Sequence, residues 1–111
     1  MGLAYTRMNQ PEQAVGLLQR SLELKSDDLN TLSTLALTLD GLKRHTESDV
    51  LYERALKVDP SYHLVLNNYS YSLTERGIQL ERALAMATEA VRQEPENASY
   101  LDTIGWVYYR L

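Results

Sequence analysis

Residues 32–60 read LSTLALTLDGLKRHTESDVLYERALKVDP, and this stretch decides the fold. Apolar residues recur at helical spacing on both sides of a polar break, so the stretch predicts two helices joined by a turn. Its first half returns twice, because Leu32, Leu66 and Leu101 are 34 and 35 residues apart. A period in the mid-thirties with two helices in each period indicates an all-α solenoid of stacked hairpins.

The period divides the chain into four segments. Residues 1–28 form a partial first repeat, 29–62 a second, 63–97 a third, and 98–111 the first helix of a fourth. A break at Asn9-Gln10-Pro11 splits the first segment, because proline suits the first turn of a new helix. Seven helices in about three repeats are therefore expected. Since no linker-like composition interrupts the pattern, we predict a single array over residues 1–111.

Composition excludes several classes of function. The chain has 15 acidic and 11 basic residues and a net charge of −4, and these are dispersed, whereas a nucleic-acid surface needs clustered basic residues. It has no cysteine and no apolar run long enough to insert in a membrane. No signal peptide is visible. The sequence leaves the compartment unknown: a cytoplasmic location is favoured, and a periplasmic one stays open if a longer parent carries a signal peptide.

The sequence offers no recognisable catalytic constellation. His45 and His63 are the two histidines, they stand far apart, and we expect both to be solvent-exposed. No metal-binding spacing, phosphate loop or nucleophile motif accompanies them. We therefore predict a protein that is not an enzyme and that takes no metal and no cofactor.

The chain resembles bacterial members of the tetratricopeptide repeat family. The family fingerprint has a large apolar residue, a Leu-Gly pair and a tyrosine in the first helix of each repeat. Leu101, Ile104-Gly105 and Tyr108 are similar to that half, and Tyr52 and Pro60 to the aromatic and proline of the second. The resemblance implies a right-handed superhelical α-solenoid whose first helices line a concave, peptide-binding wall. Small residues such as Gly105 are expected where two helices approach to within about 8–10 Å.

The resemblance also implies which residues face the concave wall: those of each first helix that lie off its packing stripe. Leu37, Tyr71 and Trp106 occupy equivalent places in successive repeats, and an apolar and aromatic ladder of this kind suits a peptide. Acidic residues beside it favour a neutral or basic peptide, and the absence of a basic cluster argues against binding of a chaperone tail. The predicted wall consists of Asn30, Ser33, Leu37, Asp40, Asn67, Tyr71, Thr74, Glu75, Asp102, Trp106 and Tyr109.

We therefore expect a non-catalytic scaffold that binds a peptide or partner protein. The alternative is an accessory segment of a larger enzyme, for example a glycosyltransferase or peptidase, that presents substrates to a catalytic domain elsewhere. A purely structural spacer is a third possibility. The last helix has no second-half partner, so Ile104, Val107, Tyr108 and Leu111 are expected to be exposed and to promote self-association.

Overall fold

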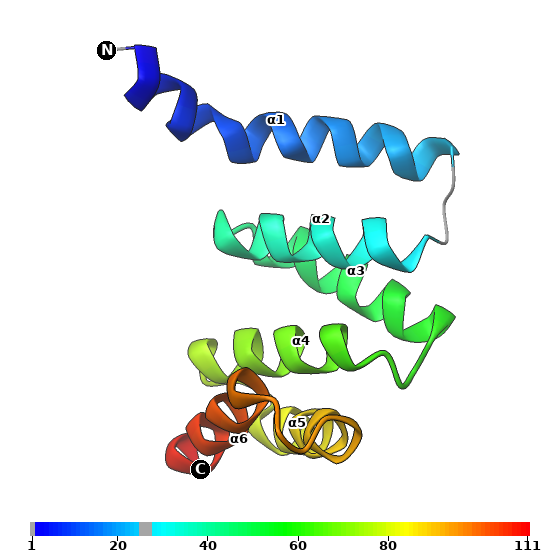
Figure 1. Cartoon of the computed structure of the whole chain (residues 1–111), viewed down its shortest axis with the longest axis vertical. Helices are drawn as coiled ribbons and strands as arrows, with labels where there is room; N and C mark the ends of the chain where they lie inside the picture. Colours follow the sequence, from blue (N-terminus) through cyan, green and yellow to red (C-terminus); the bar gives the residue numbers. More distant parts are fainter. Residues whose placement is uncertain (1, 25–27) are drawn as a thin grey trace. The chain divides into compact units, whose positions relative to one another are not determined.

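The computed structural model describes residues 2–24 and 28–111, with side chains described from residue 12 onward. Within these ranges the chain forms six helices and no strand (Figure 1), which confirms the all-α class. The helices are α1 (Gly2–Leu24), α2 (Leu29–Gly41), α3 (His45–Val58), α4 (His63–Arg76), α5 (Leu80–Gln93) and α6 (Ala98–Arg110).

The expectation of seven helices was wrong, because α1 continues through Pro11. A proline inside a helix removes one backbone hydrogen bond and crowds the carbonyl group four residues earlier. This bends a helix without ending it when the flanking residues favour helix, as the Glu-, Gln- and Leu-rich residues 12–24 do. Figure 1 shows α1 as one continuous ribbon that bends in its dark-blue part.

Helix α2 is the centre of the first of two compact units, Met1–Val58, since it contacts both α1 and α3. It begins at the N-cap Asp28, whose carboxylate accepts hydrogen bonds from the backbone N–H groups of Asn30 and Thr31 at 3.0 and 3.4 Å. One stripe of α2 is buried to within 2% exposure, as the repeat pattern predicts. It consists of Leu32, Leu35, Ala36 and Leu39.

Tyr52 joins α3 to α2. Its side chain is 0% exposed, and its hydroxyl donates to the Asp40 carboxylate at 3.1 Å. The other oxygen of that carboxylate lies 3.1 Å from Nδ1 of His45, at the start of α3. His45 is consequently half-buried, and its expected full exposure was wrong.

Helix α4 is the centre of the second unit, Asp59–Leu111, since it contacts both α5 and α6. Its packing stripe is buried to within 5% exposure and consists of Leu66, Tyr69, Ser70 and Leu73. The facing stripe of α5 is nearly inaccessible and consists of Ala83, Ala87 and Ala90. Helix α4 ends at Gly77, whose φ of 67° is the left-handed conformation that glycine adopts without strain.

Glu89 on α5 provides a test of the electrostatics of the second unit. Its carboxylate accepts hydrogen bonds from Arg92 Nε at 2.8 Å and from Gln93 at 3.0 Å, which lower its pKa from 4.5 to about 2. Because the pKa is lowered in the folded state, the stabilisation is complete above pH 4.5 and is lost as the pH falls through about 2. The stability difference between wild type and Glu89→Gln, measured by urea unfolding, should shrink over that window.

An NMR titration of the Glu89 carboxyl group checks the same prediction directly. Replacing Arg92 with leucine should return the Glu89 pKa toward 4.5, since Arg92 is its principal donor. If Glu89 already titrates near 4.5 in the wild type, the ion pair does not persist in solution.

Candidate peptide-binding surface

The predicted wall residues divide between the two units. Asn30, Ser33, Leu37 and Asp40 lie on α2, whereas the others lie on α4 and α6, which contact each other within the second unit. On α2, Leu37 is 50% exposed and Asn30 is also exposed. Asp40 is half-buried because it accepts the Tyr52 hydrogen bond. Leu37 and Asn30 are thus the α2 side chains most available to a ligand.

Three of the predicted wall residues are buried. The Ser33 hydroxyl donates to the Asn30 carbonyl at 3.1 Å, and the Thr74 hydroxyl donates to the Ser70 carbonyl at 2.7 Å. Asn67 is 7% exposed. Because Ser33 and Thr74 already use their hydroxyl protons within their own helices, they offer little to a ligand. The sequence reasoning treated all off-stripe positions as equivalent and could not separate these from the exposed ones.

The exposed members in the second unit form an aromatic and acidic surface. Tyr71 on α4 is 47% exposed and Tyr109 on α6 is 79% exposed, and the carboxylates of Glu75 on α4 and Asp102 on α6 are exposed as well. Trp106 is half-buried and stacks on Tyr109, with ring centroids 5.5 Å apart and ring planes 12° from parallel.

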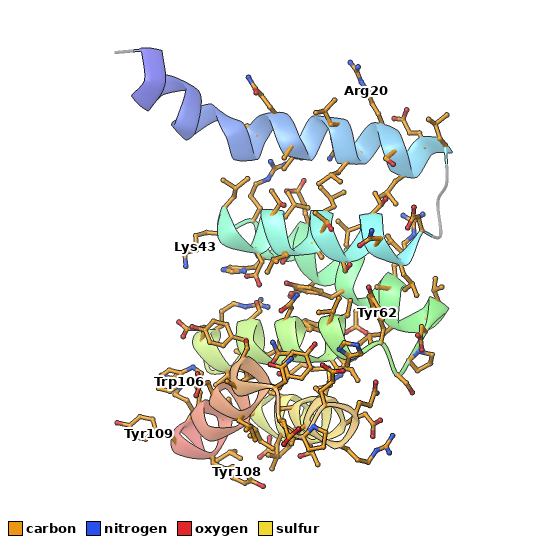
Figure 2. The ribbon with its side chains drawn as sticks, viewed as in Figure 1. Arg20, Lys43, Tyr62, Trp106, Tyr108 and Tyr109 are labelled. Atoms are coloured by element: carbon orange, nitrogen blue, oxygen red, sulfur yellow. The ribbon has the colours of Figure 1, made fainter. Side chains whose placement is uncertain are left out.

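Figure 2 shows that Trp106 and Tyr109 leave α6 on the same side, whereas Tyr108 points in a different direction. Neighbouring tyrosines therefore serve different surfaces, as expected when side chains follow each other at about 100° around a helix. We call the group of the half-buried Trp106 and the exposed Tyr71, Glu75, Asp102 and Tyr109 the aromatic surface.

Arg110 supports the aromatic surface and was not predicted. Its guanidinium carbon lies 5.6 Å from the centre of the Trp106 ring, within reach of a cation–π interaction. One guanidinium nitrogen lies 2.7 Å from the point that a Cβ atom on Gly77 would occupy. A glycine at the end of α4 therefore leaves room for this arginine. Trp106 and Arg110 are four residues apart in the sequence, and side chains at this spacing are neighbours on a helix. This spacing was the sequence signal from which their contact could have been predicted.

A second contact holds α4 and α6 together at their N-terminal ends. Nδ1 of His63 lies 2.6 Å from the Tyr100 hydroxyl, and the two rings are 5.7 Å apart. Burial raises the pKa of Tyr100, with the nearby Glu94 carboxylate adding to the shift. His63 is half-buried, so its expected full exposure was also wrong. The two helices that carry the aromatic surface are thus joined near both ends.

Two buried polar atoms next to this surface make no hydrogen bond with any described residue. They are the carbonyl oxygen Oδ1 of Asn67 and the indole nitrogen Nε1 of Trp106. Buried polar atoms are rarely left in this way in folded proteins. The missing partners are an N–H donor for the asparagine oxygen and a carbonyl acceptor for the indole nitrogen, which are the two polar groups of a peptide backbone.

The charge of the second unit is suited to a basic ligand. Residues 59–111 contain seven acidic and four basic side chains. On the aromatic surface the Tyr71 hydroxyl bonds to the Glu75 carboxylate, which raises the pKa of Tyr71 and keeps the phenol neutral. The charged side chains on or next to the aromatic surface are Glu75, Asp102 and Arg110, all of them exposed, and two of the three are acidic.

The first unit contains a separate cavity of about 320 Å³, which the sequence did not predict. Side chains from all three of its helices line it, and most are apolar. They include Leu22 from α1, Leu35 and Leu39 from α2, and Val50 and Leu51 from α3. The polar residues of its lining are Gln19, Thr46 and Glu47, which include no acid–base pair.

Neither unit carries a metal-binding cluster within the described residues, where no three His, Cys, Asp or Glu side chains converge. None of the helices in residues 2–24 and 28–111 is long and apolar enough to cross a membrane. The aromatic surface offers ring faces for stacking, buried polar atoms that lack hydrogen-bond partners, and negative charge. These features are suited to holding a peptide.

Comparison with known proteins agrees with the repeat pattern. Residues 29–58 match the family model of the tetratricopeptide repeat. A TPR repeat-containing protein of Pseudomonas aeruginosa is 24% identical over 107 residues, which cover 96% of this chain and 18% of that protein. An uncharacterized protein of Sinorhizobium fredii is 30% identical over 81 residues, which cover 73% of this chain and 44% of that protein. The chain spans less than half the length of either relative.

Proposed function

Since this chain belongs to the tetratricopeptide repeat family, we propose that it is a non-catalytic module that binds a basic peptide segment of a partner protein. Proteins of this family are in general non-catalytic scaffolds for protein–protein interaction. The observation that carries the proposal is the stacked pair on α6, in which Tyr109 is exposed and Trp106 is half-buried, together with the exposed carboxylates of Asp102 on α6 and Glu75 on α4. Large aromatic side chains on a surface are the commonest anchors of a protein interface.

The ligand's expected chemistry follows from the aromatic surface. Its lysine or arginine side chains would pair with Glu75 and Asp102 and pack over the faces of Tyr71 and Tyr109. Its backbone would satisfy Asn67 and Trp106. The more extended wall, which would include Leu37 and Asn30 on α2, stays a prediction, as does the division into repeats at residues 29–62 and 63–97.

The test is a phage-displayed random peptide library selected on the wild-type protein, with binding of the enriched peptides measured by fluorescence anisotropy. The enriched peptides should carry net positive charge. Replacing Tyr71 and Trp106 together with alanine should weaken their binding by at least about tenfold, the effect expected when two anchor residues are lost. Tyr108→Ala is the matched control, because it removes an exposed tyrosine that points away from the aromatic surface.

Equal binding by the double variant and the wild type would disprove the proposal. Enrichment of acidic peptides would disprove the charge argument. Trp106 is half-buried, so circular dichroism must show that the double variant remains folded. Tyr109→Ala offers a milder change if it does not, since Tyr109 is 79% exposed.

The alternative, an accessory segment of a larger enzyme, has one observation in its favour. The chain covers 18% and 44% of two longer relatives, so related segments occur within longer proteins. In that case the aromatic surface would hold a substrate for a catalytic domain elsewhere. Self-association through α6 is a separate proposal, because peptide binding does not require it.

A further inference from the structure

Arg110 already places a cation on the Trp106 ring of the aromatic surface. The carbon at the centre of its guanidinium group lies 5.6 Å from the centre of that ring. A cation at this distance is attracted to the electron-rich face of an indole. The free protein therefore contains, within one chain, the contact that we expect between a basic ligand and an aromatic ring.

Helix α6, which carries both Trp106 and Arg110, is packed within its unit. Val107 was expected to be exposed, but it is buried at 0% because α6 contacts both α4 and α5. Ile104 was also expected to be exposed and is half-buried. A Cβ atom on Gly105 would meet nothing within 4 Å, so the close helix approach expected there is absent from the described chain. The contact between Arg110 and Trp106 thus lies on an anchored helix.

Gly77 at the end of α4 leaves the space that the guanidinium group occupies. A Cβ atom at this position would lie 2.7 Å from one guanidinium nitrogen of Arg110. That nitrogen is the end of a long and flexible side chain, so an added Cβ atom should displace the guanidinium group and not the helix. The φ of 67° at Gly77 favours glycine as well. Gly77 therefore serves both the helix end and the placement of Arg110.

The contact is weak enough for a ligand to replace it. Arg110 is exposed, and an exposed cation–π contact changes an equilibrium about two- to fivefold. The indole nitrogen Nε1 of Trp106 is buried and has no hydrogen-bond partner among the described residues. Arg110 thus satisfies the ring face of Trp106 and leaves its N–H group unsatisfied, whereas a basic peptide segment carries both a cation and carbonyl groups.

We propose that Arg110 is an internal competitor of the basic ligand. It covers the Trp106 ring while no ligand is bound, and a lysine or arginine side chain of the ligand displaces it. This inference rests on the proposed function, since both concern the aromatic surface. A covered site lowers the apparent affinity in proportion to the uncovered fraction. A segment with several basic residues also pairs with Glu75 and Asp102, so it displaces Arg110 more readily than a single cation does.

The test is binding of a fluorescein-labelled hexa-arginine peptide to the 111-residue chain, measured by fluorescence anisotropy. Arg110→Gln removes the competing cation and should tighten binding about two- to fivefold.

Loss of any positive charge favours a basic peptide, so Arg92→Gln is the matched control. It removes an exposed arginine of the same unit that pairs with Glu89. Arg92 lies near the other end of α4, since the neighbouring Gln93 side chain donates to the Ser61 carbonyl at 2.7 Å. Its replacement should change the affinity by less than about twofold at physiological ionic strength, where distant charges are screened.

A second variant moves the guanidinium group without changing the net charge. Gly77→Ala adds a Cβ atom 2.7 Å from the present position of Arg110 and should tighten hexa-arginine binding as Arg110→Gln does. Because both changes abolish one contact, combining them should tighten binding no further than Arg110→Gln alone. Alanine at a φ of 67° strains the backbone, so circular dichroism must show that the variant is folded. Gly77→Asn replaces it otherwise, since asparagine tolerates this conformation.

Trp106 is the only tryptophan in the chain, so its emission reports the contact without any ligand. Removal of the guanidinium group from the ring should change the emission in Arg110→Gln and in Gly77→Ala, and the emission of Arg92→Gln should equal that of the wild type. Unchanged emission in both of the first two variants would show that the contact does not exist in solution, which overturns the proposal.

The binding results separate this proposal from the proposed function. If hexa-arginine binds the wild type and Arg110→Gln equally, the surface binds basic peptides but Arg110 does not compete. Weaker binding by Arg110→Gln would mean that Arg110 positions Trp106 for the ligand, and equal tightening by Arg92→Gln would mean that only net charge matters. Absence of binding to the wild type and to every variant, with emission changing as expected, would overturn the proposed function and the competitor with it.

Discussion

Replacing Tyr52 with alanine should destabilise the protein by about 3–5 kcal/mol, the usual cost of removing a large aromatic side chain from a core. Tyr52 is 0% exposed and lies between α2 and α3, so its loss leaves a cavity that two packed helices cannot close. It also removes the hydrogen bond to Asp40. The measurement is urea unfolding followed by circular dichroism.

Tyr52→Phe separates packing from hydrogen bonding. It keeps the ring and removes only the hydroxyl that donates to the Asp40 carboxylate at 3.1 Å. Its cost should be about 1.5–3 kcal/mol, since the acceptor is charged. If Tyr52→Ala costs no more than Tyr52→Phe, the ring is not a packing element and the account of the first unit is wrong.

The repeat period predicted the helical hairpins because it reports packing directly. Leu32, Leu35, Leu66 and Leu73 return at helical spacing, and each is at most 5% exposed. Burial of apolar stripes between helices is the main source of helix stability in a protein, so the pattern determines where the helices lie. The N-terminal segment was less predictable, because a proline can either begin a helix or bend one.

The candidate site was less accessible to sequence reasoning than the fold. Tyr71 and Tyr109 are exposed, but Thr74 was predicted to have the same kind of position and is 0% exposed. The Thr74 hydroxyl donates a hydrogen bond to a carbonyl group of its own helix, and the spacing of residues in the sequence does not reveal such a bond. The position of the Arg110 guanidinium over Trp106 and Gly77 depends on how α4 and α6 meet. That geometry is tertiary, and no local pattern encodes it.

Leu32→Ala and Leu101→Ala should have very different effects, although the two residues hold the same place in the repeat. Leu32 lies on α2 and is 0% exposed. Its truncation should lower the free energy of unfolding, measured with urea, by about 2–5 kcal/mol. Leu101 is 45% exposed, so its truncation in the monomer should cost well under half as much.

The comparison also distinguishes a monomer from an assembly. If α6 mediates self-association, a second copy covers Leu101 at high protein concentration, and the cost of Leu101→Ala should then rise toward that of Leu32→Ala, since binding stabilises only the folded form. At low concentration the two costs should remain far apart. Equal costs for the two variants in dilute protein would mean that Leu101 is already covered within a single chain, which would contradict its exposure on α6.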